Sequence, residues 1–264
     1  MGWPLGALAA IAGLALGLPI LALLGRAVLD GSLVAAFGLM SVVDALALSL
    51  VTTAVSLLLT IGLGLPLALV LARRSFRGST LVEAVVDLPI VLPPSVAGLA
   101  LLLLFGRRGL IGDQLHAVGI EVPFTTVAVV IAQTFVSAPF FIRSARTGFA
   151  SVDHDLEDAA RVDGASERQV FSSITAPLAG AALAAGLVMS WARSLGEFGA
   201  TIMFAGNLEG RTQTLPLVVY EEFQGGDLDA SIAAAVILVL AALGVLVAVR
   251  VLRWGRVLDV RAIA

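Results

Sequence analysis

Long apolar stretches that carry no charge divide this chain and constrain its fold more than any other feature. Each stretch is about as long as the roughly 20 residues that a helix needs to cross a bilayer. A mean hydropathy of +1.04 with 13% charged residues excludes both an ordinary soluble domain and a disordered chain. We expect an all-α integral membrane protein in which residues 1–264 form one transmembrane domain. The six expected spans cover residues 3–25, 45–72, 82–106, 122–143, 172–196 and 230–250.

The third span is the least regular of the six. Asp87, Pro89, Pro93 and Pro94 lie where a continuous helix would be disturbed, because proline removes a backbone donor and clashes with the preceding turn. The first span has neither a basic leading region nor a clear cleavage site, so we expect residues 1–25 to be a retained helix.

The arginine distribution predicts how the chain is oriented. All 16 basic residues are arginine, and connecting segments on one side of the expected spans hold most of them. The rule that cytoplasmic loops are rich in Lys and Arg places that side, with both termini, in the cytoplasm. The arginine-rich side holds Arg73, Arg74, Arg77, Arg143, Arg146, Arg161, Arg168, Arg250, Arg253, Arg256 and Arg261, and the other side holds Arg26, Arg107, Arg108 and Arg211.

The absence of certain residue types excludes several kinds of chemistry. The sequence has no cysteine, so it can form no disulfide, iron–sulfur cluster or thiolate nucleophile. It has no lysine, which excludes a P-loop nucleotide site and Schiff-base catalysis within this chain. His116 and His154 are too far apart to indicate a zinc site. We expect no metal, no cofactor, no nucleic-acid partner and no catalytic site.

Residues 151–170, on the predicted cytoplasmic side, are expected to form two short helices. Acidic residues crowd the beginning of the first helix, where they suit the helix dipole, and Gly164 is placed to end it in a left-handed conformation. Ser166 and Gln169 have the spacing of a capping box that begins the second helix. These local signals fit a solvated loop as well as a helix pair docked on a partner.

One motif favours the docked helix pair. Asp158-Ala159-Ala160, three residues, Gly164, nine residues and then Ile174-Thr175-Ala176-Pro177 resembles the signature of permease subunits of binding-protein-dependent ABC transporters. Asp158 stands where that signature has Glu, and Ala176 stands where it has Leu.

The resemblance implies a type I ABC importer permease fold, a homodimeric pore and a prokaryotic cytoplasmic membrane as its location. It also implies three kinds of protein partner: ABC ATPase subunits (two), an extracytoplasmic oxyanion-binding protein and a second permease copy. In that family the segment that corresponds to residues 151–170 forms a coupling helix, which sits in a groove of the ATPase. The coupling residues implied here are Glu157, Asp158, Ala159, Ala160, Arg161, Gly164 and Ala165.

Three further runs resemble the molybdate permeases, with sulfate and thiosulfate permeases as near relatives. They are residues 88–106, the run GEFGAT at 196–201 and the run GRTQTLP at 210–216. The resemblance implies molybdate import, with sulfate, thiosulfate or tungstate as alternatives. A secondary transporter driven by an ion gradient is a more distant alternative, because the acidic residues cluster at the ends of the expected spans rather than within them.

A small set of residues is expected to form the translocation path or its gate. A tetrahedral dianion needs a lined path across the membrane, and neutral donors suit it because they bind weakly. Pro93 and Pro94 either expose backbone amides to the anion or only kink a packed helix. Arg193 and Glu197 either act in the path or form an ion pair that fixes a helix end. The expected residues are Pro93, Pro94, Ser95, Arg193, Glu197 and Thr201.

Overall fold

A computed structural model describes residues 3–31 and 40–262, and every regular element in that part of the chain is a helix. Four helices contain segments that are long and apolar enough to cross a membrane. They are α1 (Trp3–Leu29), α3 (Met40–Arg73), α7 (Thr126–Ala150) and α14 (Leu228–Ala262), the last through its segment Leu228–Val247.

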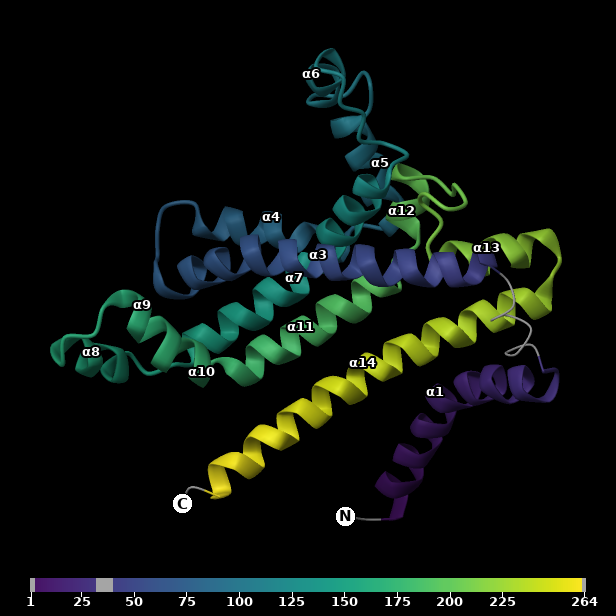
Figure 1. The fold of residues 1–264 in the computed structure, drawn as a ribbon. Helices are drawn as coiled ribbons and strands as arrows, with labels where there is room; N and C mark the ends of the chain where they lie inside the picture. Colours follow the sequence, from purple (N-terminus) through teal and green to yellow (C-terminus); the bar gives the residue numbers. More distant parts are fainter. Residues whose placement is uncertain (1–2, 32–39, 263–264) are drawn as a thin grey trace.

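Two bent helix pairs account for the remaining apolar sequence (Figure 1). The helices α4 (Ser79–Val91) and α5 (Pro94–Phe105) are bent by 118°, so the single span expected over residues 82–106 is interrupted. The physical reason is the extended backbone at Leu92 and Pro93, since the prolines at 93 and 94 cannot continue the hydrogen-bond ladder of α4.

The second pair is bent by 72° where the fifth span was expected. Its first arm contains α9 (Glu167–Val170), the π-helical turn η1 (Phe171–Thr175) and α10 (Ala176–Leu178). Its second arm is α11 (Gly180–Leu195). The expected span over 172–196 therefore begins with a bend rather than with a straight helix.

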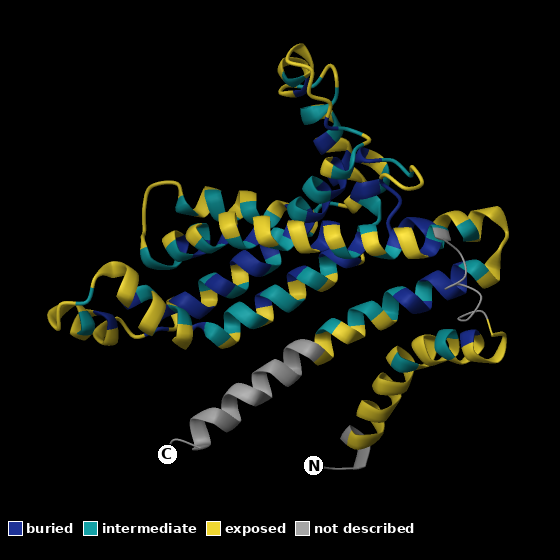
Figure 2. Cartoon of the chain, viewed as in Figure 1, coloured by how far each residue is buried: buried dark blue, intermediate teal, exposed yellow. Residues whose placement is uncertain are grey.

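The helices α3, α7 and α11 form the centre of the bundle. Figure 2 shows buried residues concentrated along α7, whereas α1 is almost entirely exposed. Small residues allow close packing: a Cβ added to Gly64 on α3 would lie 2.9 Å from Cγ1 of Ile142 on α7. Towards the α8 end an apolar cluster fills the space, and it includes Ala68, Phe141 and Phe149.

Hydroxyl and amide side chains line part of the contact among α3, α7 and α11. Thr53 accepts a hydrogen bond from Gln133 at 3.5 Å, and Ser56 accepts one from Thr134 at 3.1 Å. Ser194 of α11 also donates to Ser56, at 3.4 Å. All these contacts are between neutral groups, which suits a contact region within a bilayer.

The opposite end of the bundle carries three further short helices. They are α6 (Gly112–Ala117), α12 (Gly199–Phe204) and α13 (Leu215–Gly225). Figure 1 shows α5 and α6 projecting from the bundle as an arm. The base of this arm packs on α7 and α12 through a cluster that includes Ala97, Leu101, Val129 and Phe204.

Candidate functional site

The segment 151–170 forms the two short helices that the sequence predicts. The first is α8 (His154–Val162), which begins where Asp153 accepts a hydrogen bond from the N–H of Asp155 at 3.0 Å. Gly164 follows with φ +89°, a left-handed conformation that glycine adopts without strain. The N–H of Ser166 then donates to Oε1 of Gln169 at 2.8 Å, which is half of the predicted capping box.

The outward face of α8 exposes apolar side chains. Leu156 is 50% exposed and Val162 is 87% exposed, and the exposed Ala159 lies between them at helical spacing. A short helix with an uncovered apolar stripe, bordered by charges, is suited to docking in a groove of another protein. Figure 1 shows α8 at the end of the bundle, clear of the long helices.

Arg161 orders the connection between α8 and α9. Its guanidinium donates to Asp158 at 2.7 Å and to Glu167 at 2.7 Å. The hydrogen bond from Arg161 lowers the pKa of the Glu167 carboxyl below its usual range. The N–H of Ala165 donates to the carbonyl of Ala160 at 2.9 Å, so the turn is closed by backbone as well as by charge.

Glu157 differs from the other predicted coupling residues because it faces the interior. Its Oε1 accepts hydrogen bonds from Nη2 of Arg73 at 2.6 Å and from Oγ1 of Thr175 at 2.6 Å. Sequence reasoning missed Arg73 and Thr175 as functional candidates. Thr175 lies within the recognised motif, but no spacing rule connects Arg73 to residues more than 80 positions later.

The structure brings two parts of the predicted path together. A Cβ added to Gly199 at the start of α12 would lie 2.7 Å from Cβ of Pro94 and 3.2 Å from the backbone nitrogen of Ser95. Pro93, Pro94 and Ser95 are exposed at the start of α5, whereas Thr201 is fully buried within the subunit. The contact at Gly199 therefore holds the beginning of α12 against the beginning of α5.

Arg193 and Glu197 form the ion pair that their spacing predicts, with Nη2 and Oε2 2.5 Å apart. Oε1 of Glu197 also accepts the N–H of Ala200 at 2.7 Å. The Glu197 side chain is 1% exposed and that of Arg193 is 27% exposed. The pair therefore fixes the end of α11 to the beginning of α12, next to the start of α5.

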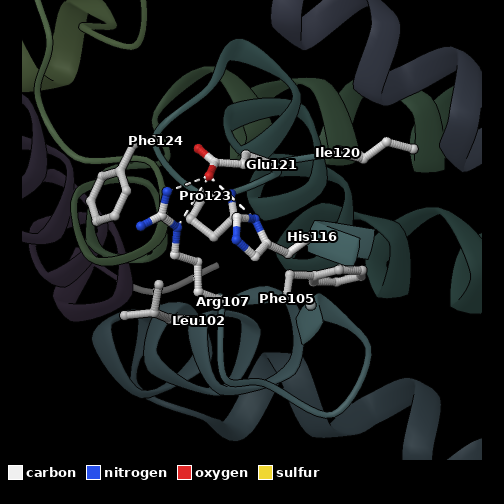
Figure 3. Close-up of a pocket in the computed structure, with 10 residues that line it drawn as sticks. Leu102, Phe105, Arg107, His116, Ile120, Glu121, Pro123 and Phe124 are labelled. Carbon is white, nitrogen blue, oxygen red and sulfur yellow. Dashed lines mark hydrogen bonds and ion pairs between the residues drawn. The ribbon is translucent and has the colours of Figure 1, made fainter. Parts of the chain in front are cut away.

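A cavity of about 370 Å³ lies at the junction of α5, α6 and the segment leading to α7 (Figure 3). Its walls are mainly apolar and include Leu102 and Phe105. Arg107 donates to Glu121 at 2.7 Å, and Nδ1 of His116 lies 3.4 Å from the same carboxylate oxygen. The Arg107 hydrogen bond lowers the pKa of Glu121. These charges satisfy one another and do not form a nucleophile–base pair.

Comparison with known proteins identifies the kind of chain to which this geometry belongs. Residues 64–255 match the family described as "Binding-protein-dependent transport system inner membrane component". The chain belongs to this family. It is thus a multi-pass membrane protein of the binding-protein-dependent transport systems, and the resemblance drawn from the Asp158–Pro177 motif is confirmed.

Named relatives are similar over most of this permease. The "Molybdenum transport system permease protein ModB" of Mycobacterium tuberculosis (strain ATCC 25618 / H37Rv) is 46% identical over 198 residues, which are 75% of each chain. The "Molybdate/tungstate transport system permease protein WtpB" of Pyrococcus abyssi (strain GE5 / Orsay) is 40% identical over 213 residues, 81% of this chain and 78% of that protein.

A solved structure confirms the fold of the permease. The crystal structure of a bacterial ABC transporter that imports the acidic polysaccharide alginate contains a chain that aligns with a TM-score of 0.75 at 19% identity. The alignment covers 95% of this chain and 94% of that chain. The chain therefore has the type I ABC importer permease fold predicted from the sequence.

Proposed function

We propose that this permease is the transmembrane subunit of an ATP-driven importer that translocates molybdate across the cytoplasmic membrane. The observation that carries the transport role is the uncovered outer face of α8, held in place by a buried contact beneath it. The substrate is supported by relatives at 46% and 40% identity whose names specify molybdenum or molybdate transport.

The outer face of α8 would bind the groove of a separate ATPase subunit. Asp158, Ala159 and Arg161 are exposed there, and Ala160 is partly exposed. Gly164 and Ala165 shape the turn that presents this face. Two copies of the permease would form the pore, each with one ATPase subunit, and α8 and both termini would lie in the cytoplasm as the arginine distribution predicts.

The exposed beginning of α5 would line the path of the anion. Pro93, Pro94 and Ser95 lie there against α12, and the Arg193–Glu197 pair holds α12 in position from the side of α11. An extracytoplasmic binding protein would deliver the anion to an outward-open pore when ATP brings the ATPases together. Hydrolysis would then return the pore to its inward-open state.

Tungstate is the second candidate substrate, because the Pyrococcus abyssi relative is named for molybdate and tungstate together. Sulfate and thiosulfate follow from the wider resemblance of the GEFGAT run at 196–201. All are tetrahedral or near-tetrahedral dianions, so neutral donors in the path would accept each of them. Selection among them would then depend mainly on the binding protein.

The decisive experiment measures anion uptake into vesicles that contain the permease with its ATPase and binding protein. Labelled molybdate, tungstate and sulfate are compared with and without ATP, and with a proton gradient in place of ATP. We expect molybdate uptake that requires ATP and the binding protein. Uptake that ignores ATP and follows the proton gradient would refute the proposal in favour of a secondary transporter.

A further inference from the structure

One carboxylate oxygen connects three segments of the permease beneath α8. Oε1 of Glu157 accepts hydrogen bonds from Arg73, the last residue of α3, and from Thr175, the last residue of η1. The Arg73 and Glu157 side chains are only 14% and 5% exposed. A single atom thus links α8 both to the end of a membrane span and to the turn that leads into α11.

The surroundings of Arg73 strengthen this link. Its Nη1 lies 3.1 Å from Nδ1 of His154 and 3.5 Å from the carbonyl oxygen of Val152, so the guanidinium holds the beginning of α8 as well as its interior face. Charge-assisted hydrogen bonds are roughly twice as strong as neutral ones, and largely buried pairs are little screened by salt. Displacing α8 relative to α3 would require these contacts to break together.

Thr175, the second hydrogen-bond donor to Glu157, lies where the helix is irregular. It lies in the π-helical turn η1, next to the 72° bend that separates residues 167–178 from α11. Backbone hydrogen bonds in a π turn are out of register with those of an α-helix, and such turns often mark functional sites. The rings of Phe149 in α7 and Phe171 in η1, with centroids 6.1 Å apart, add an apolar contact beside this turn.

We propose that the Arg73–Glu157–Thr175 cluster is the link that passes displacement of α8 to α3 and α11, with Glu157 as a positioning residue. This inference rests on the proposed docking of an ATPase subunit on the outer face of α8. The ATPase subunit would displace the outer face of α8, and the Glu157 carboxylate on the inner face would move α3 and α11 together with α8. Without the cluster, α8 could shift while the spans stay behind.

Conservative variants test this link in the assembled complex. Thr175→Val keeps the shape of the side chain and removes the hydroxyl donor, and Glu157→Gln keeps the shape and removes the charge. We expect both to lower anion uptake per ATP hydrolysed by roughly 3- to 10-fold, while the amount of bound ATPase subunit stays unchanged. Thr175→Ser retains the hydroxyl and is expected to restore the ratio.

A second ion pair at the same end of the bundle supplies the control. Arg146 of α7 and Glu83 of α4 lie 2.8 Å apart, and neither belongs to α8. Glu83→Gln removes one charge, as Glu157→Gln does, so uptake per ATP is expected to stay within about twofold of wild type. Equal losses in Glu83→Gln and Glu157→Gln would show a general effect of charge and overturn the proposal.

A distance measurement tests the link without any anion. The chain has no cysteine, so a permease with Arg74→Cys next to α3 and Asp155→Cys on α8 carries spin labels at these two positions only. Both positions are exposed. In the wild-type background the distance between the labels should be the same with and without ATP, because α8 and α3 move together. With Thr175→Val or Glu157→Gln it should change on ATP binding.

The outcomes separate this proposal from the proposed function. Normal uptake per ATP in Thr175→Val and Glu157→Gln would overturn the link. A smaller amount of assembled complex in which uptake per ATP stays normal would also overturn it, because the cluster would then only stabilise the assembly. If the wild-type complex took up no molybdate, the proposed substrate would be wrong. The label distances would still test the link, since they require ATP and the ATPase but no anion.

Discussion

Replacing Gly98 by alanine tests the close contact between α5 and α12. A Cβ at position 98 would lie 2.6 Å from the carbonyl oxygen of Ala200, 2.9 Å from Cα of Ala200 and 2.8 Å from Cβ of Met203. The shortest of these is about 0.8 Å less than the 3.4 Å at which ordinary contact begins. Two of the three obstructing atoms belong to backbone, so no side-chain rotation relieves the clash.

We expect Gly98→Ala to push α12 away from α5 and to cost about 1–3 kcal/mol of folding free energy. This corresponds to a decrease in Tm of several degrees, measured by thermal unfolding of the purified permease in detergent. Because α12 borders the exposed beginning of α5, ATP-dependent anion uptake should fall in the same variant. Folding cost and loss of transport would then have one structural cause.

Gly62→Ala supplies the matched control. Gly62 also lies within a helix, but a Cβ there would meet nothing within 4 Å. Alanine is favoured over glycine in helices by about 1 kcal/mol, so Gly62→Ala should leave Tm unchanged or raise it. If Gly98→Ala and Gly62→Ala unfolded at the same temperature with the same uptake, the contact between α5 and α12 would not constrain this permease.

Three further predictions concern charge and backbone strain. Arg193→Gln should lower Tm more than Glu197→Gln does. Arg193→Gln leaves the Glu197 carboxylate buried without its cation, at a cost of about 3–5 kcal/mol, whereas Glu197→Gln leaves an arginine that is partly exposed. Burial, together with the nearby carboxylates of Asp227 and Glu221, raises the pKa of Glu222. The free energy of unfolding therefore falls as pH rises through that pKa, because the folded state must then lose a proton that it binds more tightly than the unfolded chain does. Glu222→Gln should accordingly raise Tm at about pH 7 and leave it unchanged at about pH 4. Gly164→Val strains a left-handed turn although no atom obstructs the side chain, so it should reduce uptake per ATP; Gly180→Val, at a helical glycine that also faces open space, should not.

Local signals predicted the backbone structure of residues 151–170 well. The structure contains the acidic beginning of α8, the left-handed glycine at 164 and the Ser166–Gln169 cap. Each of these features depends only on residues close in sequence. The four-residue spacing of Arg193 and Glu197 likewise predicted their ion pair. Interactions of this range depend on helix geometry alone, so a sequence is sufficient to infer them.

Contacts between distant segments could not be predicted in the same way. The prolines at 93 and 94 indicated a disturbance, but neither the 118° angle of the bend nor the close approach of α12 to Gly98 of α5 could be inferred from them. Thr201 has the polarity expected of a path residue, yet packing buries it. The inward orientation of Glu157 follows from Arg73, which lies 84 positions earlier in the chain.

The neutral contacts among α3, α7 and α11 have a mechanical consequence. Hydroxyls such as those of Thr53, Ser56 and Ser194 can donate or accept in several rotamers, and their bonds here, at 3.4–3.5 Å for two of them, are long. Exchanging one such neighbour for another has a low barrier, whereas separating an ion pair in lipid has a high one. The ion pairs Arg73–Glu157 and Arg146–Glu83 lie instead at the α8 end of the bundle. Small shifts among α3, α7 and α11 can therefore exchange one neutral partner for another, whereas a shift at the α8 end would have to separate opposite charges.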